Sequence, residues 1–229
     1  VAFMISAGLI LVTVLPKHEV QDRLGGVWGE ISFGVRSYMR TPRLRALLTL
    51  YCAVACASAM VIVNTVVYVK ETLGGSDTEV AEAFAAHGFG SMIAAMSMTR
   101  ILDRVSDRLV MLVGAVGMGI GVLGIWTGPD LTTMLPVWML IGLGWSLVQT
   151  PAGRVVNRSA ASGDRSAYFS AQFALSHAAF LFTYPAAGWI GAQGGQVAAA
   201  MVLATLATLA TLSAARLWSP SQISVVASA

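Results

Sequence analysis

Seven stretches of apolar residues follow one another along the chain, separated by polar connections. Six of them are about 19 to 26 residues long, the length that an α-helix needs to cross the roughly 30 Å hydrocarbon core of a bilayer. These six cover residues 44–69, 80–98, 109–128, 131–153, 167–192 and 197–215. Open strands would leave backbone groups unpaired in lipid, and the stretches lack the two-residue alternation of a membrane barrel. The pattern therefore predicts an all-α membrane protein with a six-helix transmembrane bundle.

The first stretch is shorter than the others. Residues 1–16 would reach only about 24 Å as a helix, so we expect a truncated transmembrane helix with more protein upstream. The remaining boundaries are a cytoplasmic linker loop at 17–43, the bundle at 44–216 and a disordered cytoplasmic tail at 217–229. Within the loop, apolar residues such as Trp28 and Ile31 alternate with Arg36 and Arg40, which favours a helix lying on the membrane surface.

The composition supports lipid as the surrounding medium. Hydrophobic residues make up 56% of the 229 residues and charged residues only 11%, against about 25% charged residues in soluble domains. The formal net charge of +3 does not indicate a nucleic-acid partner, because the basic residues lie between apolar runs rather than in one basic patch. The expected partners are the bilayer and a small-molecule substrate.

The basic residues predict the orientation. Thirteen of the 14 fall near alternate connections, around residues 17–45, 100–108, 154–165 and after 215, and the other set of connections holds only Lys70. The second set also carries the acidic residues Glu71, Asp77, Glu79, Glu82 and Asp130. By the positive-inside rule the basic set is cytoplasmic. We therefore expect a multi-pass protein of a cell (inner or plasma) membrane with its C-terminus in the cytoplasm.

Polar and aromatic side chains inside the apolar stretches are the candidates for a transport pathway. Polar groups in hydrocarbon are costly and usually face a cavity or another helix. The candidates are Asn64, His87, Trp145, Gln149, Gln172 and His177. The two histidines carry the strongest functional interpretation, since an imidazole titrates near neutral pH. The alternative is that these groups are packing residues or hydrogen bonds between helices. No complete stretch has a deeply placed carboxylate, so a coupling carboxylate, if the protein uses one, is expected in protein upstream.

Two further residue types suggest how the helices pack. Gly117-x3-Gly121, Gly88-Phe-Gly90 and Gly142-x-Gly144 suit close contacts between helices. Trp126, Trp138, Trp189 and Trp218 fall near predicted helix ends, as an aromatic belt at the membrane interfaces requires.

Motifs for catalysis and cofactor binding are missing from the sequence. It has no Walker loop, no G-x-S-x-G elbow and no H-E-x-x-H helix. Cys52 and Cys56 share a helix face but have no His, Asp or Glu nearby to complete a metal site. We expect neither an enzyme nor a cofactor or metal.

The connection at 99–108 reads T-R-I-L-D-R-V-S-D-R. It is similar to the signature loop G-x3-D-R-x-G-R-R of major facilitator transporters, in the second and usually degraded of its two copies. Asp103, Arg104 and Arg108 match, whereas Thr99, Ser106 and Asp107 stand where the family has Gly, Gly and Arg. In the family this loop is thought to open and close one side of the transporter. The resemblance implies that Asp103 pairs with Arg100, Arg104 or Arg108 as a gating latch. The alternative is ordinary positive-inside charge with a counter-ion.

The whole plan, a partial helix, a basic loop and six helices, resembles the C-terminal half of a twelve-helix major facilitator transporter. Residues 44–112 resemble the bacterial exporter branch that includes siderophore and macrolide exporters. The resemblance implies a secondary transporter that effluxes small organic or amphiphilic compounds by alternating access, with proton-coupled antiport as an option and the N-terminal half as its partner. An importer of the same fold and a membrane scaffold or subunit without transport activity are the alternatives.

Overall fold

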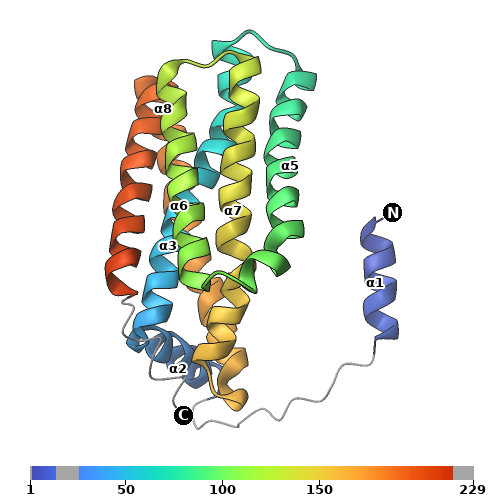
Figure 1. Cartoon of the computed structure of the whole chain (residues 1–229), viewed down its shortest axis with the longest axis vertical. Coiled ribbons are helices and arrows are strands. Elements are labelled where there is room, and N and C mark those ends of the chain that lie inside the picture. The colour runs from blue at the N-terminus through green and yellow to red at the C-terminus, as the bar shows by residue number, and fades with distance from the viewer. Residues whose placement is uncertain (1, 14–25, 219–229) are drawn as a thin grey trace.

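The computed structural model describes residues 2–13 and 26–218, and all regular structure in this part of the chain is helical (Figure 1). The main helices are α1 (Ala2–Val12), α2 (Gly26–Arg40), α3 (Pro42–Ala59), α5 (Asp77–Leu102), α6 (Asp107–Gly124), α7 (Leu131–Ser159) and α8 (Arg165–Leu217). The all-α prediction is confirmed. Predicted loop residues 17–25 and tail residues 219–229 lie outside the described residues.

The helix that begins as α3 continues beyond Ala59 with wider turns. A π-helical segment, Met60–Asn64, leads through the short α4 (Thr65–Val67) to a second π-helical segment, Tyr68–Thr72. Together these segments form one rod from Pro42 to Thr72. Single π turns inside helices often mark functional sites, and ordinary helical periodicity does not predict them.

Polar caps start three of the helices at the predicted connections. The Ser76 hydroxyl accepts a hydrogen bond from the Glu79 amide and the Glu79 carboxylate accepts one from the Ser76 amide, which is a capping box at the start of α5. Ser106 caps α6, and Asp130 caps α7 by accepting a hydrogen bond from the Thr133 amide at 2.9 Å. Each cap satisfies an amide that the helix leaves unpaired.

α8 consists of two limbs that run in opposite directions. Gly195 has φ 82° and ψ 167°, a conformation that interrupts the helix and that side chains with a Cβ rarely adopt. Ala167, early in α8, lies against Gly34 of α2, whereas Ala215, near its end, accepts a hydrogen bond from Arg108 at the start of α6. The break lies within the predicted connection 193–196, so the two apolar stretches predicted here are separate helical limbs.

α3 forms the centre of the bundle, and most of its residues from Leu44 onwards are buried. Trp138 of α7 is fully buried beside it, and its indole N–H donates to the Thr65 hydroxyl at 2.8 Å. The prediction of a membrane-interface belt is therefore wrong for Trp138, and also for Trp218, which is 3% exposed. Trp126 and Trp189 are both 69% exposed, as a belt requires.

Glycines allow α7 to approach its neighbours closely. A Cβ at Gly114 of α6 would lie 2.7 Å from the Gly144 carbonyl oxygen of α7, and one at Gly90 of α5 would overlap the Met139 carbonyl. The predicted close contact is confirmed for Gly90, Gly121, Gly142 and Gly144. It is wrong for Gly88, where an added Cβ would have no neighbour within 4 Å, and for Gly117, where the nearest atom would be the Leu140 side chain at 3.7 Å.

Four of the described helical rods are long and apolar enough to cross a membrane: Pro42–Thr72, Asp107–Thr127, Leu131–Ser159 and Ser162–Leu217. The last contains both limbs of α8, and α5 is not among them because polar residues interrupt its apolar run. The count of six crossings therefore stays a prediction. α1 lies apart from the bundle in Figure 1, with Met4 and Leu11 exposed.

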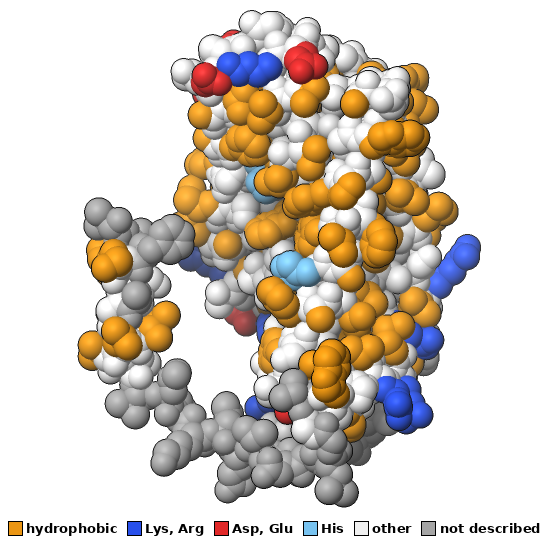
Figure 2. Space-filling model, turned by 180° about the vertical axis from the view of Figure 1, so that it is seen from behind, with side chains coloured by type: hydrophobic (Ala, Val, Ile, Leu, Met, Phe, Trp, Pro, Cys, Tyr) orange, Lys and Arg blue, Asp and Glu red, His pale blue; other side chains and the backbone are white. Residues whose placement is uncertain are grey.

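Charged groups separate towards the two ends of the bundle. Figure 2 shows basic side chains gathered at one end, and acidic side chains beside a single basic group at the other. Lys70, in the connection before α5, forms an ion pair with Asp77 at 2.6 Å. Tyr68 donates to the Pro129 carbonyl at 2.8 Å, which places the connections after α3 and before α7 at the same end. The end that carries the arginines is called the basic end below, and its cytoplasmic location stays a prediction.

Candidate functional site

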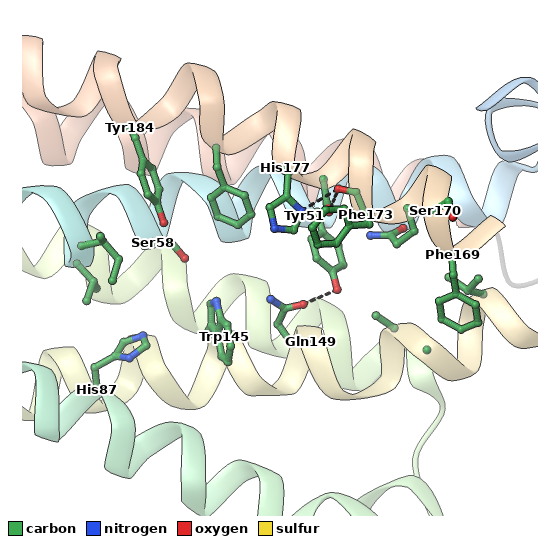
Figure 3. A pocket seen from close by; sticks show the side chains of 18 residues that line it. Tyr51, Ser58, His87, Trp145, Gln149, Phe169, Ser170, Phe173, His177 and Tyr184 are labelled. Carbon is green, nitrogen blue, oxygen red and sulfur yellow. Dashed lines mark hydrogen bonds between the residues drawn. The ribbon is translucent and has the colours of Figure 1, made fainter. Parts of the chain in front are cut away.

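A groove of about 960 Å³ runs between α3, α5, α7 and the first limb of α8 (Figure 3). Its walls include Tyr51, Ser58, His87, Trp145, Gln149, Gln172, Phe173, His177, Phe180 and Tyr184. Figure 2, which views the bundle from behind, shows the described histidines among apolar side chains on this face. This volume is near the upper end of the range for small-molecule pockets. We call this site the aromatic groove.

One wall of the aromatic groove is a row of rings along the first limb of α8. Phe173, His177, Phe180 and Tyr184 are spaced by four, three and four residues, which places them on one helix face. Phe173 and His177 stack with ring centroids 3.9 Å apart, and the next two pairs are 5.6 Å and 5.5 Å apart. These centroid distances are typical of stacked and edge-to-face rings. The wall therefore offers ring faces and edges to a bound molecule.

The opposite wall carries two more rings. His87 of α5 and Trp145 of α7 meet edge to face, with ring centroids 6.3 Å apart. α5 and α7 can hold these rings together because Gly142, one helical turn before Trp145, lies directly against the His87 backbone carbonyl. The glycine contact thus sets the position of the His87–Trp145 pair.

A hydrogen bond between side chains crosses the groove from α3 to α7. The Tyr51 hydroxyl donates to the Gln149 side-chain carbonyl, as the dashed line in Figure 3 shows. A second pair of the same type lies nearby, where Tyr38 of α2 donates to Gln172 of α8. Both glutamines therefore have a structural partner and also line the groove.

His177 has one ring nitrogen occupied. Its Nδ1 lies 2.8 Å from the Phe173 carbonyl oxygen, so in the neutral ring Nδ1 carries the hydrogen and donates. Nε2 is then the acceptor of the neutral imidazole. The second groove histidine, His87, is half-buried. Among the described residues that line the groove there is no Asp, Glu, Lys or Arg.

The structure brings five of the six predicted pathway residues together in the aromatic groove: His87, Trp145, Gln149, Gln172 and His177. Asn64 lies elsewhere. It is 1% exposed, its amide contacts the Met60 sulfur at 3.5 Å, and its side chain lies near Gly191 and Gln196. A transport role for any of the six stays a prediction.

Sequence reasoning missed the aromatic contribution. Tyr51, Phe173 and Phe180 line the groove, and none of the three is among the residues predicted from the sequence. The sequence does carry a signal for the aromatic wall. Helical spacing places four rings on one helix face, those of Phe173, His177, Phe180 and Tyr184. No comparable pattern marked Tyr51, whose helix is buried on most sides.

The three predicted gating residues lie at the basic end, around a second pocket of about 380 Å³. Asp103 and Arg104 are exposed, whereas Arg108 is half-buried and donates to the Ala215 carbonyl at 3.1 Å. Among the described residues, Asp103 makes no ion pair in this structure, and its expected role as a gating latch stays a prediction. It is the C-cap residue of α5, and its side chain is exposed.

Asp107, which departs from the signature-loop pattern, makes the ion pairs instead. Its carboxylate lies 2.8 Å from the Arg158 guanidinium and 3.5 Å from Nε of Arg154, both on α7. Its side chain is only 10% exposed, and its place in the first turn of α6 suits a negative charge. Asp107 thus ties α6 to α7 at the basic end.

No group of three His, Cys, Asp or Glu side chains that could hold a metal ion is found in residues 2–13 and 26–218. The expectation that the chain uses no metal or cofactor, and is not an enzyme, stays a prediction.

Comparison with known proteins identifies one family. The family model described as Major Facilitator Superfamily matches residues 47–225. The match covers most of each helix that forms the aromatic groove, and it leaves out α2. No curated protein matches the chain.

Proposed function

The chain belongs to the major facilitator superfamily of membrane transporters, and we propose that it is the C-terminal half of an exporter of small amphiphilic organic compounds. The aromatic groove would be its half of the transport pathway. The upstream half would supply a second helix bundle, and the two bundles would rock about the groove to expose it to each side of the membrane in turn.

The chemistry of the aromatic groove supports this class of cargo. Its described lining residues offer aromatic rings, two imidazoles, two amides and hydroxyl groups, and no charged side chain. A strongly charged solute would lose its hydration there without gaining an ion-pair partner, which is unfavourable. An apolar or aromatic solute gains burial and ring contacts, and a delocalised cation can also bind over the ring faces.

The proposed cargo also supports export as the direction of transport. Compounds that dissolve in lipid enter a cell across the bilayer without a protein. A transporter with an uncharged aromatic groove is therefore useful chiefly for moving them out against their gradient. For proton coupling, His87 and His177 are the proton carriers that this groove offers.

Gating is proposed for the basic end. Arg104, Arg108 and Asp103 surround the second pocket, and Asp107 supplies the carboxylate that holds α6 to Arg154 and Arg158 of α7. A network that is made in one state and broken in the other would give the two-state element that alternating access needs.

The test is directional flux of a fluorescent lipophilic dye in vesicles that contain the full-length transporter. We expect movement from the cytoplasmic face to the outer face. Trp145→Ala should reduce it by about tenfold, because a large ring contact is lost. Trp126→Ala is the matched control, since Trp126 is 69% exposed and outside the groove.

The paired replacement His87→Gln and His177→Gln tests proton coupling in the same assay. It should abolish the dependence of flux on a pH gradient.

Equal losses of flux for Trp145→Ala and Trp126→Ala would show that the groove is not part of the pathway. Net movement inwards would favour an importer of the same fold.

A further inference from the structure

The pocket at the basic end has an unusual concentration of arginines. Five line its volume of about 380 Å³: Arg43 of α3, Arg104 from the connection before α6, Arg108 of α6, and Arg154 and Arg158 of α7. The acidic groups in the same lining are Asp103 and Asp107. Five positive and two negative side chains leave an excess of three positive charges around one cavity.

The two aspartates do not neutralise this excess locally. Asp107 is already shared by Arg154 and Arg158. Asp103 is exposed and makes no ion pair with a described residue. Arg43, Arg104 and Arg108 therefore face the pocket without a carboxylate partner among the described residues.

One of these arginines also carries a buried donor without a partner. Nε of Arg108 is buried and has no hydrogen-bond partner among the described residues, although the terminal nitrogen of this guanidinium donates to the Ala215 carbonyl. Buried polar groups in proteins are nearly always paired, so such a donor calls for a partner from outside the described chain.

The positive-inside rule accounts for basic residues at this end but not for their convergence. Arg36, Arg40, Arg100 and Arg216 lie at or near the same end, and none of them lines the pocket. The convergent residues are all arginines and none is lysine. The planar guanidinium offers paired donors that match the oxygens of a phosphate group.

We propose that this pocket binds a phosphate group, held by Arg43, Arg104 and Arg108, with Arg154 and Arg158 contributing charge while they hold Asp107. The group could be carried by an anionic lipid headgroup at the membrane surface or by a free phosphate in solution. The apolar side chains of Leu102, Val105 and Trp218 also line the pocket, and the volume suits a small ligand.

The experiment titrates two probes into the full-length protein after delipidation in an uncharged detergent. One is inorganic phosphate at constant ionic strength, and the other is phosphatidylglycerol in mixed micelles. A neutral galactolipid without phosphate is the reference, and native mass spectrometry measures retained lipid. We expect binding of at least one phosphate probe above the reference.

Two paired variants separate a site from general charge. Arg43→Gln with Arg104→Gln removes two pocket charges, and neither side chain makes a hydrogen bond or ion pair with a described residue, so the fold should persist. We expect about tenfold weaker phosphate binding, because charge-assisted hydrogen bonds are lost. Arg100→Gln with Arg216→Gln is the control, because it removes the same charge from exposed positions outside the pocket.

The outcomes distinguish the two sources of phosphate. Tight binding of phosphatidylglycerol alone identifies a lipid headgroup site, and binding of inorganic phosphate identifies a site for a soluble ligand. Equal loss in the pocket and control pairs, or no binding above the galactolipid reference, would overturn the proposal. Either result would leave the transport role of the aromatic groove unaffected.

Discussion

Two glycines determine how closely α5 and α7 approach each other. A Cβ at Gly142 would overlap the His87 carbonyl oxygen, and one at Gly90 would overlap the Met139 carbonyl oxygen. In both places the obstacle is backbone, which cannot move aside as the end of a flexible side chain can. The close contact between α5 and α7 also places the His87 ring beside the Trp145 ring in the aromatic groove.

Gly142→Ala should therefore destabilise the protein by about 1–3 kcal/mol, the usual cost of overfilling a tight contact. Gly88→Ala is the matched control, since its Cβ would have no neighbour within 4 Å, and alanine is the better helix former there. Thermal unfolding in detergent measures both. Equal stability of the two variants would show that the helices lie further apart than described.

Polar residues in apolar stretches identified most of the groove from the sequence alone. His87, Gln149, Gln172 and His177 line it because polar groups in such helices favour a cavity over lipid. Asn64 does not, and the reason is physical. α3 is buried on most sides, so no amphipathic pattern in residues 44–69 shows which of its faces meets the groove.

Among the elements, α2 is attached to the bundle by a few specific contacts. Gly34 lies against Ala167, where a Cβ would be 2.6 Å from the carbonyl oxygen, and fully buried Tyr38 donates to Gln172. Burial raises the pKa of Tyr38, so its hydroxyl keeps the proton that it donates. The predicted surface helix is thus a helix docked on α8, and its position on the membrane stays a prediction.

Tyr38→Phe should weaken this docking by about 1–3 kcal/mol, because it leaves the buried Gln172 carbonyl unpaired. Adding Gln172→Leu should recover part of the loss, since both polar groups are then gone. Hydrogen exchange of residues 26–40 and thermal unfolding measure the cycle. Additive losses in the double variant would mean that the two side chains do not interact.

The capping box at the start of α5 gives this element a pH dependence. Hydrogen bonds from the Ser76 amide and hydroxyl lower the pKa of Glu79. The pKa of Glu79 is therefore lower in the folded protein than in the unfolded chain. At pH values above the usual glutamate pKa the capping box stabilises α5 fully, and this stabilisation is lost as the pH falls through the lowered pKa of Glu79.

Hydrogen exchange of residues 77–82 should therefore accelerate a few-fold, after correction for intrinsic rates, as the pH falls through this window. Glu79→Gln should show a flatter profile. An unchanged profile in the variant would rule out Glu79 as the titrating group.

Helix boundaries were more predictable than helix irregularities. Long apolar runs indicated where the helices lie, and in the structure Ser76, Ser106 and Asp130 cap the starts of three of them. The break in α8 was predictable from the short connection at 193–196. Gly195 in this connection adopts the non-helical backbone conformation that separates the two limbs. The π-helical turns after Ala59 were not, because apolar residues continue through them without any change of pattern.

At the scale of the whole molecule, the bundle separates two kinds of chemistry. The aromatic groove lies along the length of the helices and has no charged lining residue among those described, whereas the second pocket gathers arginines at one end. The family match shows a membrane transporter of the superfamily, and this separation supports the proposal that its cargo is apolar.

The most direct test of that account is whether cargo occupies the aromatic groove. Ser170→Cys places a thiol in an exposed part of the groove, and Thr78→Cys places one at the opposite end, outside it. Both are made in full-length protein with Cys52 and Cys56 replaced by alanine. The rate of labelling by a water-soluble maleimide is measured with and without a transported compound. At ten times its dissociation constant, the compound should slow labelling at position 170 by about tenfold and leave position 78 unchanged. Equal labelling rates at position 170 with and without the compound would contradict the account.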